Sequence, residues 1–429
     1  MATGARSRMR TLSRAALDTA LRRAPRVPPR PKVVPCPLAA PQQRLEHGLQ
    51  PHFAHLASIA NRRALRRDPV YRRLRPELDR VLDGFAWDLE IARPRGDASS
   101  LRAVAWNVER GKRFEPLMAA MHEQPELRDA DLLLLTELDV GMGRSNNRDV
   151  PQEIARATGM AYVYANFHLV LAPGDSAEQE PGFDNALGLH GAALFSRWPV
   201  RRAWAVELPE FTDKFHAIEK RLGSKRALMC ELAMPQGPLL VVVVHLDPFA
   251  PPRHRAAQLR GVLDAVAATG VSRVLVGGDF NTNTYHLGSS LGLGVDVLNK
   301  LVRFGFEGTV RQYMRPEHYF ERDVFATLTA AGLRHDGFTD PDAGTIHYDL
   351  NDPEVRDKSL QYLPRPVFRW LERRLSPWNG CVPMRVDHFA GRGVRPVAAR
   401  TLPRDLPTGR VSDHAPLVLD FELESTGRD

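Results

Sequence analysis

The chain has 429 residues, 43% of them hydrophobic, which is enough for a sizeable core and for about two or three domains. Its net charge of +8 is uneven, because residues 1–97 hold 20 basic and 9 acidic residues whereas the remainder holds 39 basic and 42 acidic. This balance does not support a broadly basic nucleic-acid-binding face on the main domain, but it does not exclude a local basic groove. The longest apolar run, residues 239–244, is too short to span a bilayer.

The N-terminal segment has its own composition. Residues 1–43 are rich in Arg, Pro and Ala and contain one acid, Asp18, which predicts a disordered basic tail. In a eukaryotic protein this segment would resemble a mitochondrial presequence, and in a bacterial protein it would be a plain basic tail, which is the interpretation we favour. The three cysteines are far apart and form no CxxC pair, so we expect a reducing compartment, the cytoplasm.

Residues 44–97 have the leucine spacing of helices and predict a helical N-terminal extension of two or three helices packed against the main domain. The arginine-rich run 62–80 is interpreted as a solvated helix face. As an alternative, this basic extension could contact an anionic partner, either a membrane or nucleic acid. Residues 94–100 are expected to be a linker.

From Leu101 onward, short apolar runs alternate with amphipathic segments, which predicts an α/β domain with two layers of sheet or a mixed sheet. Residues 172–185 are expected to form a loop, and residues 341–384 a long insertion with a short helix at 367–375. Expected strands cover residues 101–106, 132–136, 191–195, 226–233, 239–245, 274–276, 385–389 and 415–422. Expected helices cover residues 114–122, 151–158, 255–268 and 319–331.

The segment 271–284 carries the first candidate functional residues. A buried strand at 274–276 ends in two glycines, followed by Asp279 and Asn281. If the chain stays extended there, both polar side chains point the same way. A carboxylate that accepts a proton from water would then lie beside an amide that holds a substrate oxygen. Taken alone, the same residues could simply form a turn after a strand.

Polar residues of similar kinds follow or precede other predicted strands, and as a set they are hard to explain by structure alone. If such a set binds a metal, hard oxygen ligands without cysteine favour Mg²⁺ or Mn²⁺ over zinc. The set comprises Asn107 and Glu109 after strand 101–105, Glu137 after LLLLT, His245 after VVVV, Asp279 and Asn281, Asp387 in RVDHF, and Asp413 with His414 in SDH.

The ordered motifs WNVERG, LLLLTELD, HGAALFSRWPV, VVVVHLD, VGGDFNTN, RVDHF and SDHAPLVLDF resemble the endonuclease/exonuclease/phosphatase (DNase I-like) superfamily over residues 101–424. The resemblance implies a four-layered α/β sandwich, with two mixed β-sheets face to face and helices outside. It also implies a metal site, in which Glu137 is the principal Mg²⁺ ligand, Asn107 binds metal or phosphate, and Asp413 completes the set.

The same resemblance assigns the catalytic roles. Asp279 would orient or deprotonate the attacking water, and Asn281 would hold a phosphate oxygen. His414 would contact the scissile phosphate, with Asp387 behind it, and His245 would be a second catalytic histidine that contacts substrate. We expect Asp387 to accept a hydrogen bond from His414 and to raise its pKa.

Some positions depart from the family pattern or are ambiguous. Glu109 stands where apurinic endonucleases usually carry Asp, and His388 follows Asp387 where many members have Tyr. Arg197 and the pair Lys225 and Arg226 could bind phosphate, but we favour ordinary surface cations.

These observations predict a Mg²⁺-dependent phosphodiesterase acting on nucleic acid or on a phospholipid or sugar-phosphate headgroup. The alternatives are a phosphomonoesterase and a noncatalytic binding module that kept the fold. The sequence does not separate these substrates, nor does it predict the oligomeric state.

Overall fold

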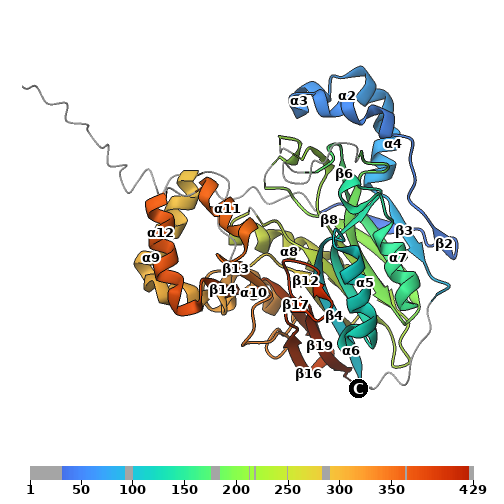
Figure 1. The fold of residues 1–429 in the computed structure, drawn as a ribbon. Helices are drawn as coiled ribbons and strands as arrows, with labels where there is room; N and C mark the ends of the chain where they lie inside the picture. The colour runs from blue at the N-terminus through green and yellow to red at the C-terminus, as the bar shows by residue number, and fades with distance from the viewer. Residues whose placement is uncertain are drawn as a thin grey trace, which may run out of the picture.

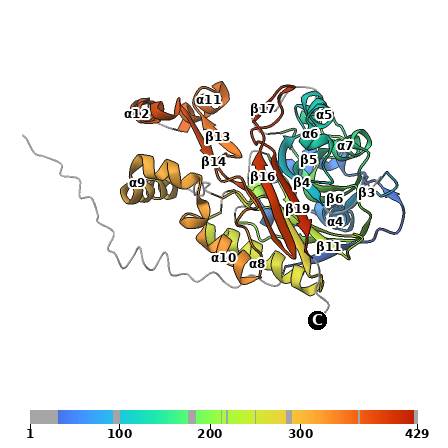
Figure 2. The same ribbon diagram turned by 90° about the horizontal axis from the view of Figure 1, so that it is seen from below.

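The computed structural model shows two mixed β-sheets packed face to face, with helices on both outer sides (Figures 1 and 2). This is the four-layered α/β sandwich that the sequence predicts. The structure describes residues 31–91, 100–174, 184–211, 213–216, 219–248, 250–282, 290–362 and 365–424. In these residues no helix is long and apolar enough to cross a membrane.

Each large sheet contains one parallel pair among antiparallel neighbours. The six-stranded sheet has the order β1 (Val33–Cys36), β8 (Val200–Glu207), β10 (Arg226–Leu232), β11 (Leu239–His245), β12 (Arg273–Asp279) and β15 (Asp387–Arg392). The nine-stranded sheet has the order β16 (Val394–Thr401), β19 (Leu417–Leu423), β4 (Leu101–Arg110), β5 (Leu132–Val140), β7 (Leu189–Ser196), β6 (Ala161–Val170), β3 (Phe85–Asp88) and β2 (Gln42–Gln43), with β9 (Arg221–Gly223) paired to β6.

Alternation along the strands builds three apolar layers. Val241 and Val243 of β11 face the other sheet, while Val242 and Val244 face the outer helices. Because successive strand residues point to opposite faces, a continuous apolar run is what a strand covered on both sides requires. The runs LLLL and VVVV therefore specify the layered core directly.

Helices cover both outer faces. The nine-stranded sheet is covered by α4 (Pro69–Leu82), α5 (Phe114–Glu123), α6 (Pro125–Arg128) and α7 (Val150–Thr158), and the six-stranded sheet by α8 (Pro252–Ala268) and α10 (Arg322–Ala330). The remaining elements near this body are α2 (Phe53–Ser58), α3 (Arg62–Leu65), β17 (Asp405–Leu406), β18 (Gly409–Arg410) and short 3₁₀ turns at Gln50–His52, Gly143–Ser145, Lys214–His216, Pro316–His318 and Ser376–Trp378.

The N-terminal residues join the sheets, which corrects two expectations. Val33–Cys36 of β1 pairs with β8, so the predicted disordered tail over 1–43 is wrong for this stretch; residues 1–30 lie outside the described residues. Within the extension predicted to be helical, β3 (Phe85–Asp88) is a fully buried strand paired with β6. Both segments are only four residues long, and their pairing with β8 and β6 overrides the local composition. The predicted linker falls largely on residues that are not described.

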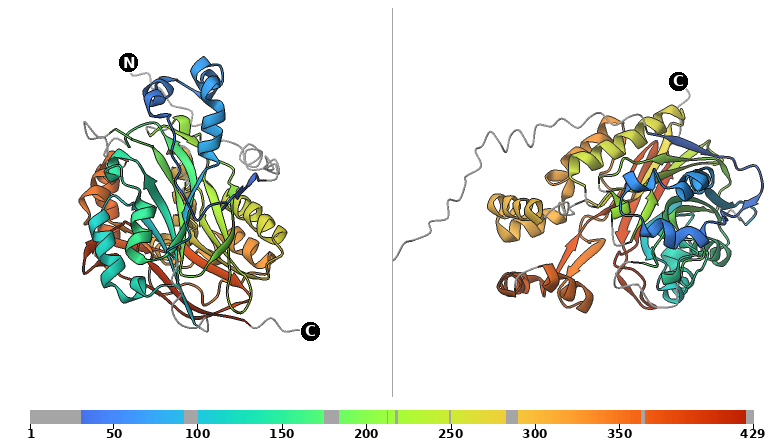
Figure 3. Two further views of the ribbon diagram at one scale, coloured as in Figure 1. Left: turned by 90° about the vertical axis from the view of Figure 1, so that its right-hand side faces the viewer. Right: turned by 90° about the horizontal axis from the view of Figure 1, so that it is seen from above.

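A subdomain projects from the sandwich (Figures 2 and 3). It consists of α9 (Ser290–Tyr313), the hairpin of β13 (Ile346–Asp349) and β14 (Cys381–Met384), α11 (Pro353–Tyr362) and α12 (Arg365–Leu375), and it has a small apolar core of its own. The two helical segments of α9 meet at Gly305, whose backbone is not helical. The expected insertion over 341–384 falls here, whereas α9 has no counterpart in the sequence prediction.

A first prediction concerns Gly278, one of the two glycines before Asp279. Its φ is +129°, and a Cβ there would lie 2.3 Å from the Val244 carbonyl oxygen of the neighbouring strand. Gly278→Ala should lower the free energy of unfolding by roughly 2–5 kcal/mol, combining backbone strain with overpacking. The matched control is Gly270→Ala, with φ +71° and nothing within 4 Å, which should cost only about 1–2 kcal/mol. Urea unfolding measures both, and equal losses would show that the close strand approach is unimportant.

A second prediction concerns His168, a fully buried residue whose two ring nitrogens have no hydrogen-bond partner among the described residues. Burial, with nearby Arg221 and His190, holds its pKa well below the ordinary value of 6.5. Below about pH 6.5 the unfolded chain therefore takes up a proton that the folded chain refuses, and stability falls by up to about 1.4 kcal/mol per pH unit. His168→Phe should flatten the loss of stability between pH 7 and pH 5. The exposed control His318→Gln should leave the slope unchanged, and an unchanged slope in both would contradict the prediction.

Candidate active site

Three strands of the six-stranded sheet deliver the first part of the site in register. His245 at the end of β11 pairs with Asp279 at the end of β12, and Asp279 pairs with Asp387 at the start of β15. Because β11 and β12 are parallel and β15 is antiparallel, these two strand ends and one strand start meet at the same edge. All three residues are buried.

The nine-stranded sheet delivers the second part from its own parallel pair, β4 and β5. Both strands are irregular where they end: pairing shifts between Asn107 and Arg110, and again at Glu137. Glu137 has φ +56° there. A bulge of this kind redirects a side chain, and left-handed backbone in a glutamate is a strained conformation typical of functional sites. The Ser412 hydroxyl donates to the Asn107 carbonyl oxygen (2.6 Å), which ties the SDH motif to this strand end.

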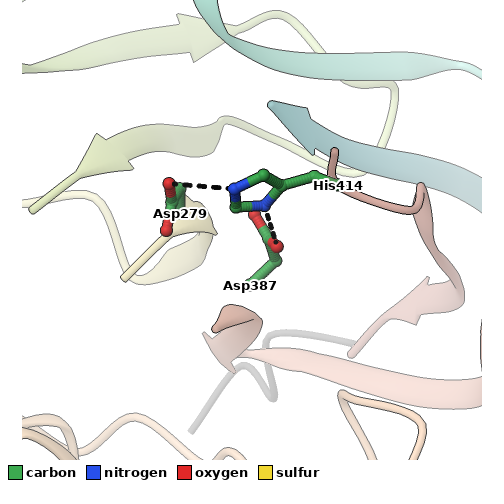
Figure 4. A group of neighbouring side chains, drawn as sticks. All are labelled: Asp279, Asp387 and His414. Carbon is green, nitrogen blue, oxygen red and sulfur yellow. Dashed lines mark hydrogen bonds and ion pairs between the residues drawn. The ribbon is translucent and has the colours of Figure 1, made fainter. Parts of the chain in front are cut away.

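His414 lies between two carboxylates (Figure 4). Its Nδ1 is 2.8 Å from Asp387 Oδ2, so the expected hydrogen bond is present, and its Nε2 is 3.9 Å from Asp279 Oδ2. One ligand-type atom from each of the three residues lies within 4.8 Å of the others. Although such a group could hold a metal, Asp387 already occupies one nitrogen of His414, an arrangement that suits orientation and proton transfer.

The pKa shifts in this group separate the roles of acid and base. Burial would lower the pKa of His414, but Asp387 and Asp279 outweigh it and hold the pKa well above 6.5. Burial and the neighbouring Asp387 raise the pKa of Asp279 to about 7, against the opposing effect of His414. A protonated imidazole thus faces a carboxylate that can take up a proton near neutral pH.

Two further side chains converge on Asp279. Asn107 donates from Nδ2 to Asp279 Oδ2 at 3.2 Å, and His245 Nε2 lies 3.5 Å from the same oxygen. His245 Nε2 is also 3.8 Å from Glu137 Oε1, so His245 lies between Asp279 of the six-stranded sheet and Glu137 of the nine-stranded sheet. Burial, followed by Lys225, holds the pKa of His245 well below 6.5, which makes it a neutral imidazole.

The position of Asn281 differs from the expected geometry. The strand ends at Asp279, and Asn281 has φ +50°, so the assumption of an extended chain is wrong. Its backbone N–H donates to Asp279 Oδ1 at 2.8 Å, which is an Asx turn, and its side-chain amide donates to the Leu246 carbonyl oxygen at 2.9 Å. The turn interpretation and the functional one are therefore compatible, because the turn fixes the Asp279 carboxylate.

The acids near Glu137 have the character of a site for a hard cation. The Glu137 carboxylate has Arg110 Nε and His245 Nε2 at 3.8 Å each, beyond hydrogen-bond distance. Burial raises the pKa of Asp413, and Glu109 and Glu137 raise it further, against His414. Crowded carboxylates of this kind, beside the amide of Asn107, fit an oxygen-liganded divalent cation.

The cations considered as phosphate binders are not ordinary surface residues, which corrects that expectation. Arg197 is buried and donates to the carbonyl oxygens of Ala130 and Arg128 at 2.8 and 2.9 Å. Arg226 is buried and pairs with Asp83 at 2.8 Å. Both are therefore structural.

Lys225 is different, because it belongs to the site. Its Nζ donates to the Leu246 carbonyl oxygen at 3.1 Å. Burial lowers its pKa to about 8, against the attraction of Asp279, Asp247 and Glu137. The sequence gives no sign of this role, because nothing in the motif GSKR marks a lysine as half-buried near carboxylates.

The structure also shows the contacts of Glu109 and His388, the two residues that depart from the family pattern. Glu109 forms ion pairs with Lys112 (2.9 Å) and Arg113 (2.5 Å). His388 is fully buried, contacts Thr282 Oγ1 at 2.9 Å and packs its ring against Phe280. His388 is therefore a core histidine, since alternation along β15 turns it away from the face that carries Asp387.

The model of the Endonuclease/Exonuclease/phosphatase family matches residues 104–414. The chain belongs to this family. Family members are hydrolases that act on phosphate esters and are generally metal-dependent. No curated protein sequence matches the chain.

Solved structures similar to this chain include family members from several sources. A Bacteroides vulgatus family protein is 13% identical and covers 76% of this chain and 100% of its own, with a TM-score of 0.44. SmcL is 13% identical, covering 75% and 99%, with a TM-score of 0.44. The human Nocturnin catalytic domain with bound sulfate is 15% identical, covering 76% and 94%, with a TM-score of 0.42.

The pairing of His414 with Asp387 gives a third prediction. His414→Ala and Asp387→Asn should each lower kcat on a phosphate ester by roughly two to four orders of magnitude, since each removes the oriented donor. The double variant should be little worse than the worse single one, because the two residues act as one unit. Steady-state kinetics measure this, and additive losses in the double variant would contradict the pairing.

Proposed function

We propose that this protein is a Mg²⁺- or Mn²⁺-dependent phosphodiesterase that hydrolyses its substrate by in-line attack of water. The observation that carries the proposal is the convergence of Asp279, His245 and the pair His414 and Asp387 at one sheet edge, next to Asn107 and Glu137 of the other sheet. Such a set contains a base, an acid and neutral donors within a few ångströms.

In the proposed mechanism Asp279 accepts the proton of the attacking water. Its carboxylate is fixed on one oxygen by the Asn281 N–H and on the other by the Asn107 amide, so it cannot rotate away. A pKa of about 7 makes it an effective base near neutral pH.

His414 supplies the opposing charge. It donates from Nε2 to a nonbridging phosphate oxygen while Asp387 holds Nδ1–H and fixes the tautomer. His245, neutral and facing Asp279, contributes a second contact to the phosphate. Lys225 adds a positive charge behind the base, which offsets the negative charge of the bound phosphate.

Glu137, Asn107 and Asp413 would hold the cation. When bound, it would neutralise charge on the phosphate oxygens and the leaving oxygen. The proposed substrate is a diester of nucleic acid or of a phospholipid or sugar-phosphate headgroup.

Hydrolysis of a panel of phosphate esters separates this proposal from two alternatives. A phosphomonoesterase would release phosphate from inositol phosphates and spare bis-p-nitrophenyl phosphate, plasmid DNA, RNA and sphingomyelin. A noncatalytic module would bind one of them without turnover. The presence of Glu137, Asp279 and His414 together disfavours the second alternative, because a binding module has no use for a base and an acid in contact.

The fourth prediction tests the cation site. The protein should hydrolyse at least one diester of the panel with Mg²⁺ or Mn²⁺ and lose that activity in EDTA. Glu137→Gln should abolish activity at unchanged Tm, because it removes one ligand charge at nearly constant volume. The matched control Glu115→Gln makes the same change at a side chain that is 78% exposed and should leave activity intact. Activity of Glu137→Gln near the wild-type level would overturn the assignment.

A further inference from the structure

The projecting subdomain gathers the exposed apolar surface of the molecule. Of the ten large apolar side chains that are exposed in the described residues, six lie on α9, α11 and α12 of this subdomain. On α9, Val295, Leu298 and Val302 are spaced at i, i+3 and i+7, so they form one stripe along the helix. Val302 is 78% exposed and Leu298 60%, more than the other large apolar side chains described.

Helix α12 of the subdomain carries both apolar and cationic residues. On α12, Val367 and Trp370 are exposed one turn apart, and the guanidinium of Arg374 lies 5.9 Å from the Trp370 ring centre. The Trp370 ring stands edge-on against Phe306 of α9, which joins the two helices. The helix carries four arginines, Arg365, Arg369, Arg373 and Arg374, and one acid, Glu372, which pairs with Arg356 at 2.8 Å.

We propose that this subdomain docks the protein on an anionic lipid membrane, with α9 and α12 lying in the interface. An exposed apolar stripe with an interfacial tryptophan and an excess of arginine is the combination that inserts among acyl chains and attracts anionic headgroups. The occupant is a lipid surface rather than nucleic acid, because a phosphate backbone offers nothing to bury Leu298 and Val302. A second copy of the chain would place the arginines of two α12 helices near each other across a two-fold axis, which is unfavourable.

The base of the subdomain adjoins the site, so docking would present the site to the surface. The Thr345 hydroxyl accepts from the backbone N–H of Asp387 at 3.1 Å, and the Thr345 carbonyl accepts from Ala415 N–H at 2.7 Å. Ile346, the first residue of β13, forms a β-bridge with His414. The docking itself does not depend on the proposed hydrolysis.

The test is co-sedimentation of the full chain with vesicles of phosphatidylcholine alone or mixed with phosphatidylglycerol. We expect binding that is stronger on the mixed vesicles. Leu298→Gln/Val302→Gln should weaken it at least about tenfold, because two apolar side chains no longer leave water. The matched control Val397→Gln removes an apolar side chain that is 53% exposed on β16 and should bind normally.

A charge pair and a spectroscopic readout separate this surface from the basic N-terminal extension. Arg369→Gln/Arg373→Gln should weaken binding to the anionic vesicles roughly fivefold for each arginine removed. Arg63→Gln/Arg67→Gln, near α3, should leave it unchanged. Brominated phosphatidylcholine should quench the protein's fluorescence, and Trp370→Phe should remove much of that quenching.

Each other outcome overturns the proposal. Loss of binding only in Arg63→Gln/Arg67→Gln would assign the contact to the N-terminal extension. Equal binding of wild type and Leu298→Gln/Val302→Gln, binding to duplex DNA in place of vesicles, or self-association abolished by that variant without vesicle binding would each assign another occupant. Soluble bis-p-nitrophenyl phosphate serves as a control, since any hydrolysis of it should be equal in wild type and Leu298→Gln/Val302→Gln. If the protein hydrolyses no phosphodiester, vesicle binding should still be observed, so failure of the proposed function is distinguishable from failure of the proposed docking.

Discussion

The register between strands is the constraint on which the site depends. His245, Asp279 and Asp387 occupy one row across three neighbouring strands, so their spacing is set by the hydrogen-bond ladder. A slip of one residue would turn a side chain to the opposite face. Such a slip between β11 and β12 is costly because the close approach at Gly278, where a Cβ would lie 2.3 Å from the Val244 carbonyl oxygen, admits only glycine, and this packing fixes the geometry of the candidate site.

The pKa shifts at the site follow from the burial of its ionisable side chains. Desolvation pushes Asp279 toward its neutral form and His245 toward its neutral form, whereas the contact with Asp387 keeps His414 charged. The two imidazoles are thus separated into a neutral one and a charged one, and the carboxyl group between them has a pKa near neutral pH. Left-handed backbone at Glu137 and Asn281 adds strain at the same edge, and the surrounding pairing holds it in place.

Local pattern predicts layered β-sheets with a polar residue after each apolar run, whereas the four-layered sandwich is predicted from the family resemblance. Runs such as LLLL and VVVV specify strands buried on both faces, and the polar residue after each run is delivered to the edge. Lys225, Arg110 and the bulge at Glu137 could not be predicted, since they depend on how one strand end meets another. The strands β1 and β3 were missed for the same reason: a run of four residues becomes a strand only when a neighbouring strand is there to pair with it.

The position of the projecting subdomain in the chain explains how the fold tolerates it. The segment between Asn281 and Asp387 begins and ends beside the site, and Phe280 N–H donates to the Val386 carbonyl oxygen at 3.0 Å between its two ends. Within this segment α10 packs on the six-stranded sheet, and Thr345 and Ile346 contact Asp387 and His414. Because the two ends are already paired, lengthening the segment raises its loop-closure entropy cost by only about 0.6 kcal/mol for each doubling of its length. New surface can therefore be added beside His414 without disturbing the row formed by His245, Asp279 and Asp387.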